Sequence, residues 1–241
     1  MFKKLVHQYK STPRVRQVMG LFSVNIIGIP IGVFTSIVIT RYLGAQGYGD
    51  YQFIQSIFSF AIIIFTFGFL QAGNRALVLN NDKQKAREYY GAELAITGGL
   101  FIIMSVFLVL YALFDGNIQE KQLDEFLLFV IPFGWIFLLS RYFETLFQAD
   151  NRIRMLGQVR LFPKAGFLIT GLLLYFVFTN IETNRLALVW AFYIATEVIV
   201  YTIILIKLKI SFKNINKRFN EIWSYNKSFG FNVYLGSLFA V

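Results

Sequence analysis

Six apolar stretches, each long enough to cross a lipid bilayer, divide this chain of 241 residues, and a seventh begins near Ser228. A hydrocarbon core of about 30 Å takes roughly 20 helical residues to cross. The sequence therefore predicts an all-α fold, a polytopic transmembrane helical bundle with six spans and the start of a seventh. The predicted spans are Met19–Thr40, Tyr51–Gly73, Tyr90–Phe114, Phe126–Phe147, Leu161–Ile181 and Leu186–Ile206.

Positive charge is concentrated in alternate gaps between these stretches. Eighteen of the 23 Lys and Arg residues fall in the N-terminal arm and in the second, fourth and sixth gaps. The other gaps hold only Arg41, Lys121 and Arg185. Because basic residues in short loops resist translocation, we predict that the N-terminus and the even-numbered loops are cytoplasmic.

The composition excludes several kinds of site. The net charge of +10 occurs as short clusters beside apolar spans, a pattern that favours contact with lipid headgroups over nucleic-acid binding. The chain has no Cys and one His, His7, so it lacks the residues for a Cys- or His-based metal site and for a thiol nucleophile. It also lacks a Gly-x-x-x-x-Gly-Lys-Ser/Thr phosphate loop. We predict no metal and no cofactor.

The spans and gaps divide the chain into four predicted parts. These are a cytoplasmic basic arm (1–18), a first six-helix transmembrane bundle (19–208), a cytoplasmic linker (209–227) and the start of a second bundle (228–241). Pro30 in the first span and Pro132 followed by Gly134 in the fourth predict bent helices, because proline removes a backbone donor. Such bends are common in transporters.

Two motifs carry a resemblance to a known family. One is the first outer loop, Ile39-Thr-Arg-Tyr-Leu-Gly-Ala-Gln-Gly-Tyr-Gly-Asp-Tyr-Gln52, and the other is the end of the second span, Phe67-Gly-Phe-Leu-Gln-Ala-Gly-Asn-Arg75. Both resemble the polysaccharide-biosynthesis family of O-antigen (Wzx-type) flippases, within the multidrug/oligosaccharidyl-lipid/polysaccharide exporter superfamily. The resemblance implies two bundles of six helices, of which this chain supplies the N-terminal half. Because the chain stops inside an apolar run, we expect it to be part of a longer protein.

Charged residues inside the spans are the main candidates for function, because a charge at the bilayer centre costs about 2.5–3.5 kcal/mol. Glu197 lies deepest, roughly 16 Å into the sixth span at 1.5 Å per residue. It is either an ion-coupling acid or a structural carboxyl bonded to a neighbouring helix. Arg141 and Glu144 share one face of the fourth span, either as a local i,i+3 pair or as a cavity-lining pair that meets an anionic substrate.

Further polar residues occupy span ends and span interiors. Arg41, Asn74 and Arg75 end the first two spans, where each is either an interfacial anchor or a substrate ligand. Asn25 lies inside the first span and needs a hydrogen-bond partner there. The substrate-binding candidates are Arg41, Arg75, Arg141, Glu144, Asn25 and Asn74, with Glu197 as the ion-coupling candidate. Glu93 and Lys164 lie near cytoplasmic ends and are expected to reach water.

The resemblance implies a flippase in the cytoplasmic membrane of a bacterium. Its substrate would be a polyprenyl-pyrophosphate-linked oligosaccharide, a repeat unit of O-antigen, capsule or exopolysaccharide, moved by alternating access. A proton or sodium gradient would drive it, and a polysaccharide polymerase would be a partner. Two alternatives are a multidrug cation antiporter of the same superfamily and a membrane glycosyl- or acyltransferase on the same lipid carrier. A transferase would need clustered acid/base or metal-binding residues at one membrane face, and the sequence has no such cluster. We therefore predict that the chain is not an enzyme.

Overall fold

The computed structural model describes residues 13–80, 82–116, 118, 123–178 and 184–239, and within these ranges it contains helices and turns and no strand. The predicted all-α class is confirmed. Residues 1–12 of the predicted N-terminal arm, with His7, and Lys121 of the third gap lie outside the described residues. The helices are α2 (Pro13–Phe65), α3 (Phe69–Leu79), α4 (Lys83–Phe114), α6 (Asp124–Val130), the 3₁₀ turn η1 (Ile131–Phe133), α7 (Trp135–Ala149), α8 (Ile153–Val177), α9 (Arg185–Leu208), α10 (Ile215–Tyr225), the π-helical segment η2 (Asn226–Gly230) and α11 (Phe231–Leu238).

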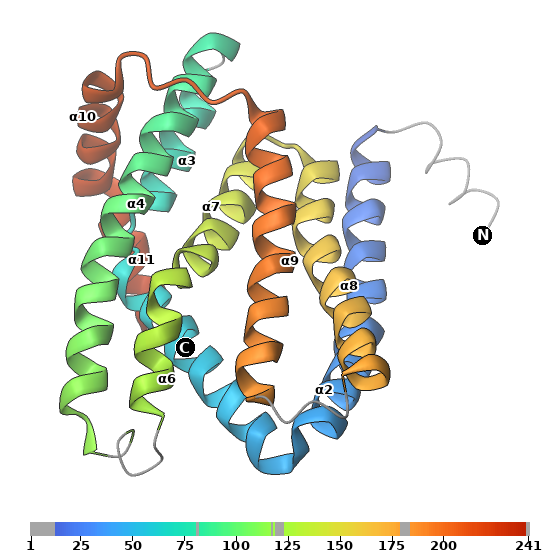
Figure 1. Ribbon diagram of the computed structural model, residues 1–241. Coiled ribbons are helices and arrows are strands. Elements are labelled where there is room, and N and C mark those ends of the chain that lie inside the picture. The colour runs from blue at the N-terminus through green and yellow to red at the C-terminus, as the bar shows by residue number, and fades with distance from the viewer. Residues whose placement is uncertain (1–12, 81, 117, 119–122, 179–183, 240–241) are drawn as a thin grey trace.

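Helix α2 consists of two arms that meet at Gly44. This residue has φ 78° and ψ 172°, a conformation that glycine adopts without the steric cost of a Cβ. Figure 1 shows the first arm running down beside α8 and the second arm turning back up toward α3. The predicted first span, Met19–Thr40, lies in the first arm, and the predicted second span, Tyr51–Gly73, follows the second arm and then crosses a break into α3. The gap predicted between them, after Thr40, is helical apart from Gly44.

The second arm ends at a break between Phe65 and Phe69. Phe67 and Gly68 both have positive φ, 44° and 77°, and α3 starts directly afterwards. The Tyr234 hydroxyl of α11 donates a hydrogen bond of 2.7 Å to the carbonyl of Ile64, beside the break. In lipid a carbonyl without a partner costs several kcal/mol, so α11 stabilises the break.

A second break interrupts the predicted fourth span. α6 and η1 meet α7 at a bend of 43°, one residue after Phe133. Pro132 lies in the η1 turn and Gly134 directly follows it, so the bend falls where the sequence predicted a bent helix. Around Pro30 the backbone stays helical. The non-helical residue in α2 is Gly44.

Among the described residues, four helices are long and apolar enough to cross a membrane, or five if the bent pair α6–α7 counts as one span, so the predicted count of six spans and the start of a seventh is not confirmed. The four helices are Met19–Phe65, Gln84–Phe114, Ile153–Val177 and Arg185–Leu208. Their outward side chains are apolar and exposed, among them Phe60, Ile169 and Phe176 at 66%, 65% and 75%. Soluble proteins rarely expose apolar surface on this scale, so this surface faces lipid in a multi-pass membrane protein.

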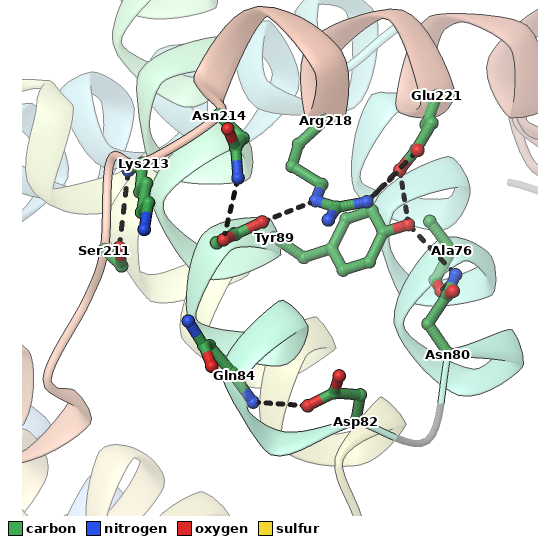
Figure 2. Close-up of polar contacts among 11 residues, drawn as sticks. Ala76, Asn80, Asp82, Gln84, Tyr89, Ser211, Lys213, Asn214, Arg218 and Glu221 are labelled. Carbon is green, nitrogen blue, oxygen red and sulfur yellow. Dashed lines mark hydrogen bonds and ion pairs between the residues drawn. The ribbon is translucent and has the colours of Figure 1, made fainter.

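Helix α10 packs against α3 and α4, and a buried polar cluster holds it there (Figure 2). Arg218 donates hydrogen bonds of 2.8 Å to Glu88 and to Glu221, and its side chain is 8% exposed. Tyr89 donates to Glu221 at 2.6 Å, and Asn80 at the end of α3 donates to the Tyr89 hydroxyl at 2.9 Å. The Arg218 guanidinium joins α10 to α4, and Tyr89 extends the cluster to the end of α3.

This cluster predicts both a stability loss and a pH dependence. Removing one partner of a buried ion pair costs about 3–5 kcal/mol, so Arg218→Ala should lower the melting temperature of the purified full-length protein strongly. The neighbouring exposed Lys217→Ala is the control. Partial burial disfavours the charged form of Glu221, but hydrogen bonds from Tyr89 and Arg218 outweigh it and hold its pKa below the ordinary value.

The contribution of Glu221 to the free energy of unfolding is therefore fully present above the ordinary carboxyl pKa. It is lost as the pH falls through the lowered pKa of Glu221 in the folded protein. Thermal melts from neutral pH down into the acid range should show a decline that Glu221→Gln removes. Identical acid profiles for the wild type and Glu221→Gln would contradict this assignment.

Candidate functional site

A cavity of about 450 Å³ lies among α2, α7, α8 and α9. Its walls combine apolar side chains with polar and charged groups that the four helices direct inward. The polar lining residues are Asn25, Ser140, Glu144, Arg160, Lys164, Glu197 and Tyr201. Gly28 leaves room on α2, since a Cβ there would lie 3.9 Å from the Lys164 ammonium nitrogen. We call this the polar cavity.

Glu144 lines the polar cavity and pairs with two arginines. Its carboxylate accepts a hydrogen bond of 2.8 Å from Arg160 on α8 and lies 3.6 Å from Arg141 one turn before it on α7. Arg160 also reaches the side-chain oxygen of Asn25 on α2 at 3.5 Å. Three helices are thus joined by one arginine that lines the cavity.

A smaller cavity of about 250 Å³ adjoins the first. Lys164 and Glu197 line both, so a cation and an acid stand where the two spaces meet. One carboxylate oxygen of Glu197, Oε2, is buried and has no hydrogen-bond partner among the described residues. A buried acceptor without a partner is costly and marks a place where a proton, ion or ligand can bind.

The structure brings three of the predicted site residues together and separates the others. Asn25, Glu144 and Glu197 line the polar cavity, and Arg141 pairs with Glu144 while its own side chain is 55% exposed. The local i,i+3 pair of Arg141 and Glu144 forms, and Glu144 lines the cavity, while contact of this pair with an anionic substrate stays a prediction. The sequence did not decide between the two interpretations.

The remaining three predicted residues lie elsewhere. Arg41 is exposed near the Gly44 break. Asn74 and Arg75 line a separate, mainly apolar groove of about 470 Å³ beside η2, where the Arg75 guanidinium lies 4.3 Å from the Phe229 ring centroid. Neither the polar cavity nor this groove contains Arg41, Arg75 and Arg141 together, and their roles stay predictions.

Two cavity cations, Arg160 and Lys164, were not among the predicted site residues. The fifth span was predicted to begin at Leu161, which left Arg160 in the fourth gap and Lys164 at the cytoplasmic end of the span, whereas α8 begins at Ile153. Glu93 is a further correction. It was expected to reach water, but it is fully buried against Gly73, with neither carboxylate oxygen hydrogen-bonded among the described residues.

The chemistry of this site agrees with what the comparisons with known proteins found. Residues 15–241 match the model of a family described as polysaccharide biosynthesis protein. The chain belongs to this polysaccharide biosynthesis family. Searches of curated proteins and of solved structures returned no match. Members of this family are generally membrane transporters of the flippase type, and a polar cavity within apolar helices suits that role.

The polar cavity predicts a pattern of water access in this family member. Single cysteines at Asn25 and Ser140 should react with a membrane-impermeant methanethiosulfonate, because only a hydrated thiol ionises and attacks. A cysteine at Ile169, 65% exposed on the lipid-facing side of α8, should not react. These 241 residues contain no native cysteine, so they add no background labelling. Equal reactivity at all three positions would contradict a hydrated cavity between these helices.

Proposed function

We propose that the protein moves a polyprenyl-pyrophosphate-linked oligosaccharide across the cytoplasmic membrane by alternating access. The observation that carries the proposal is the presence of Arg160 and Lys164 in a cavity inside the transmembrane helices. Placing such charges there is costly, and a transported anion supplies a reason for both. The membership of the polysaccharide biosynthesis family supports a lipid-linked sugar as that anion.

Arg160 is the residue best placed to bind pyrophosphate. A guanidinium group binds phosphate oxygens through two parallel hydrogen bonds, a geometry that lysine lacks. Glu144 holds this guanidinium at 2.8 Å, with Arg141 beside the same carboxylate. Substrate binding would exchange Glu144 for phosphate, and Arg141 would then keep Glu144 neutralised at the rim of the cavity.

The topology of the proposed transporter follows from the helices and the charge pattern. The two arms of α2, then α4, the α6–α7 pair, α8 and α9 would form six spans, with η2 and α11 opening a seventh. The N-terminus and α10 would lie in the cytoplasm. Breaks at Gly44, at Phe67–Gly68 and around Pro132 would give the bundle the joints that alternating access requires.

Glu197 is the proposed site of coupling to a proton or sodium gradient. It lies near the middle of α9, lines both cavities, and carries a buried oxygen without a hydrogen-bond partner among the described residues. Because Lys164 lines the same two cavities, a charge change at Glu197 would alter the local field on the substrate anion. A cationic drug is disfavoured there, since Arg160 and Lys164 would repel it.

The proposal predicts a graded series of export defects. In a strain that lacks the gene and is complemented by full-length variants at matched membrane abundance, Arg160→Ala should lower surface polysaccharide by about 100-fold and Arg160→Lys by about tenfold. Glu197→Gln should insert normally but transport without a response to the ion gradient. Arg154→Ala is the matched control, because Arg154 is an exposed arginine on the same helix. Wild-type polymer from both Arg160→Ala and Glu197→Gln would contradict the proposal.

A further inference from the structure

The smaller cavity has a lining unlike that of the polar cavity. Beyond the shared Lys164 and Glu197, it is lined by hydroxyl, amide and aromatic side chains from both arms of α2 and from α8 and α9. These residues are Thr35, Ser36, Tyr48, Tyr51, Gln52, Gln55, Phe167 and Tyr193. Gly32 opens one wall, since a Cβ there would have no atom within 4 Å.

Two Tyr–Gln pairs stand side by side on the second arm of α2. The Gln52 amide donates to the Tyr48 hydroxyl at 2.7 Å, and the Gln55 amide donates to the Tyr51 hydroxyl at 2.7 Å. Each pair uses one of the two amide N–H groups internally, so each keeps the other N–H and a hydroxyl proton to donate and an amide carbonyl oxygen to accept. The pairs are offset by three residues, roughly 4.5 Å along the helix.

An aromatic base supports these pairs. The Tyr51 ring lies 5.4 Å from Trp190, 6.1 Å from Phe167 and 6.4 Å from Tyr193, measured between ring centroids. Tyr51 is 4% exposed, so its ring is fixed by packing, while Tyr48 stacks on it at 6.3 Å and is only partly covered. A rigid aromatic base holds the polar edges in place before any ligand binds.

We propose that this smaller cavity is a carbohydrate subsite, in which Tyr48–Gln52 and Tyr51–Gln55 bind neighbouring sugar hydroxyls. A pyranose presents donor–acceptor hydroxyls around its edge and an apolar C–H face, which match the paired side chains and the aromatic surface. The inference rests on the proposed function, since it places the sugar of a lipid-linked oligosaccharide beside the pyrophosphate at Arg160. Lys164 lines both cavities, so it would contact the pyrophosphate–sugar junction.

The chemistry disfavours a purely anionic or cationic occupant. The lining beyond Lys164 and Glu197 carries no formal charge, and these two residues oppose each other. An aromatic cage for a quaternary cation would gain from cation–π attraction, but the Lys164 ammonium would oppose that cation. Uncharged hydroxyl groups are therefore the ligands that this lining fits best.

The test compares a lipid with and without its sugar. Purified full-length protein in nanodiscs is titrated with undecaprenyl pyrophosphate and with the lipid-linked oligosaccharide extracted from cells that carry the gene, and binding is followed by thermophoresis. The glycosylated lipid should bind the wild type at least tenfold more tightly. The double variant Gln52→Ala/Gln55→Ala should lose about tenfold in affinity for the glycosylated lipid and stay within twofold for the bare lipid.

Matched variants separate the subsite from folding and from the phosphate site. Gln46→Ala changes an exposed glutamine on the same arm and should bind both lipids as the wild type does. Tyr48→Phe keeps the ring and removes the hydroxyl, and should weaken only the glycosylated lipid. Arg160→Ala should weaken both lipids equally.

The outcomes distinguish two kinds of failure. If the double variant and Tyr48→Phe bind the glycosylated lipid like the wild type while Arg160→Ala loses both lipids, the subsite is overturned and the proposed function stands. If the wild type binds neither lipid, the proposed function fails. If tetraphenylphosphonium binds and Gln52→Ala/Gln55→Ala abolishes its binding, the cavity is a cation site and the carbohydrate inference is overturned.

Discussion

The cost of a charge in hydrocarbon governs the arrangement of this bundle. A charged group at the bilayer centre costs about 2.5–3.5 kcal/mol even in the mildest measurements, so it must find an opposite charge or water. Arg160 meets both needs, because it pairs with Glu144 and lines the polar cavity. The four helices α2, α7, α8 and α9 therefore surround a polar space and do not close on an apolar seam.

The two ends of the molecule differ in how firmly they are held. At the α10 end, Arg218 binds carboxylates on α4 and α10, and Tyr234 of α11 donates to the carbonyl at the break after α2. At the other end, the arms of α2 meet at Gly44, whose Cβ position is open. The break at Gly44 therefore lies beside the smaller cavity, whose walls come from both arms of α2, whereas the break at Phe67–Gly68 is held by α11.

Much of the fold could be predicted from the sequence, because hydropathy alone identifies long apolar helices. α9 matches its predicted span closely, α4 ends at the predicted Phe114 but begins at Lys83 instead of Tyr90, and Pro132 lies at a bend. The start of α8 was missed for a physical reason. Arg152, Arg154, Arg160 and Lys164 lower local hydropathy, although long side chains can point from a helix into a cavity.

The site was less predictable, because its contacts are between residues distant in sequence. Glu144 could be paired from the sequence with Arg141, three residues away, but its closest partner is Arg160 on another helix. The break at Phe67 could not be foreseen either, since the group that satisfies it is Tyr234, 170 residues away from Ile64. Glu93 was placed near water by its distance from the helix end, but α3 covers it with Gly73.

We propose that the pyrophosphate binds at Arg160 in the polar cavity and not at Arg75 in the groove beside η2. A photoreactive undecaprenyl pyrophosphate, with its crosslinker next to the phosphates, tests this directly when crosslinked to the full-length protein in native membranes and mapped by peptide mass spectrometry. We expect crosslinks on α7, α8 and α9 around Glu144, Arg160 and Glu197, abolished by Arg160→Ala and retained in Arg75→Ala. Crosslinks confined to α3 and η2 around Arg75, unaffected by Arg160→Ala, would contradict the account.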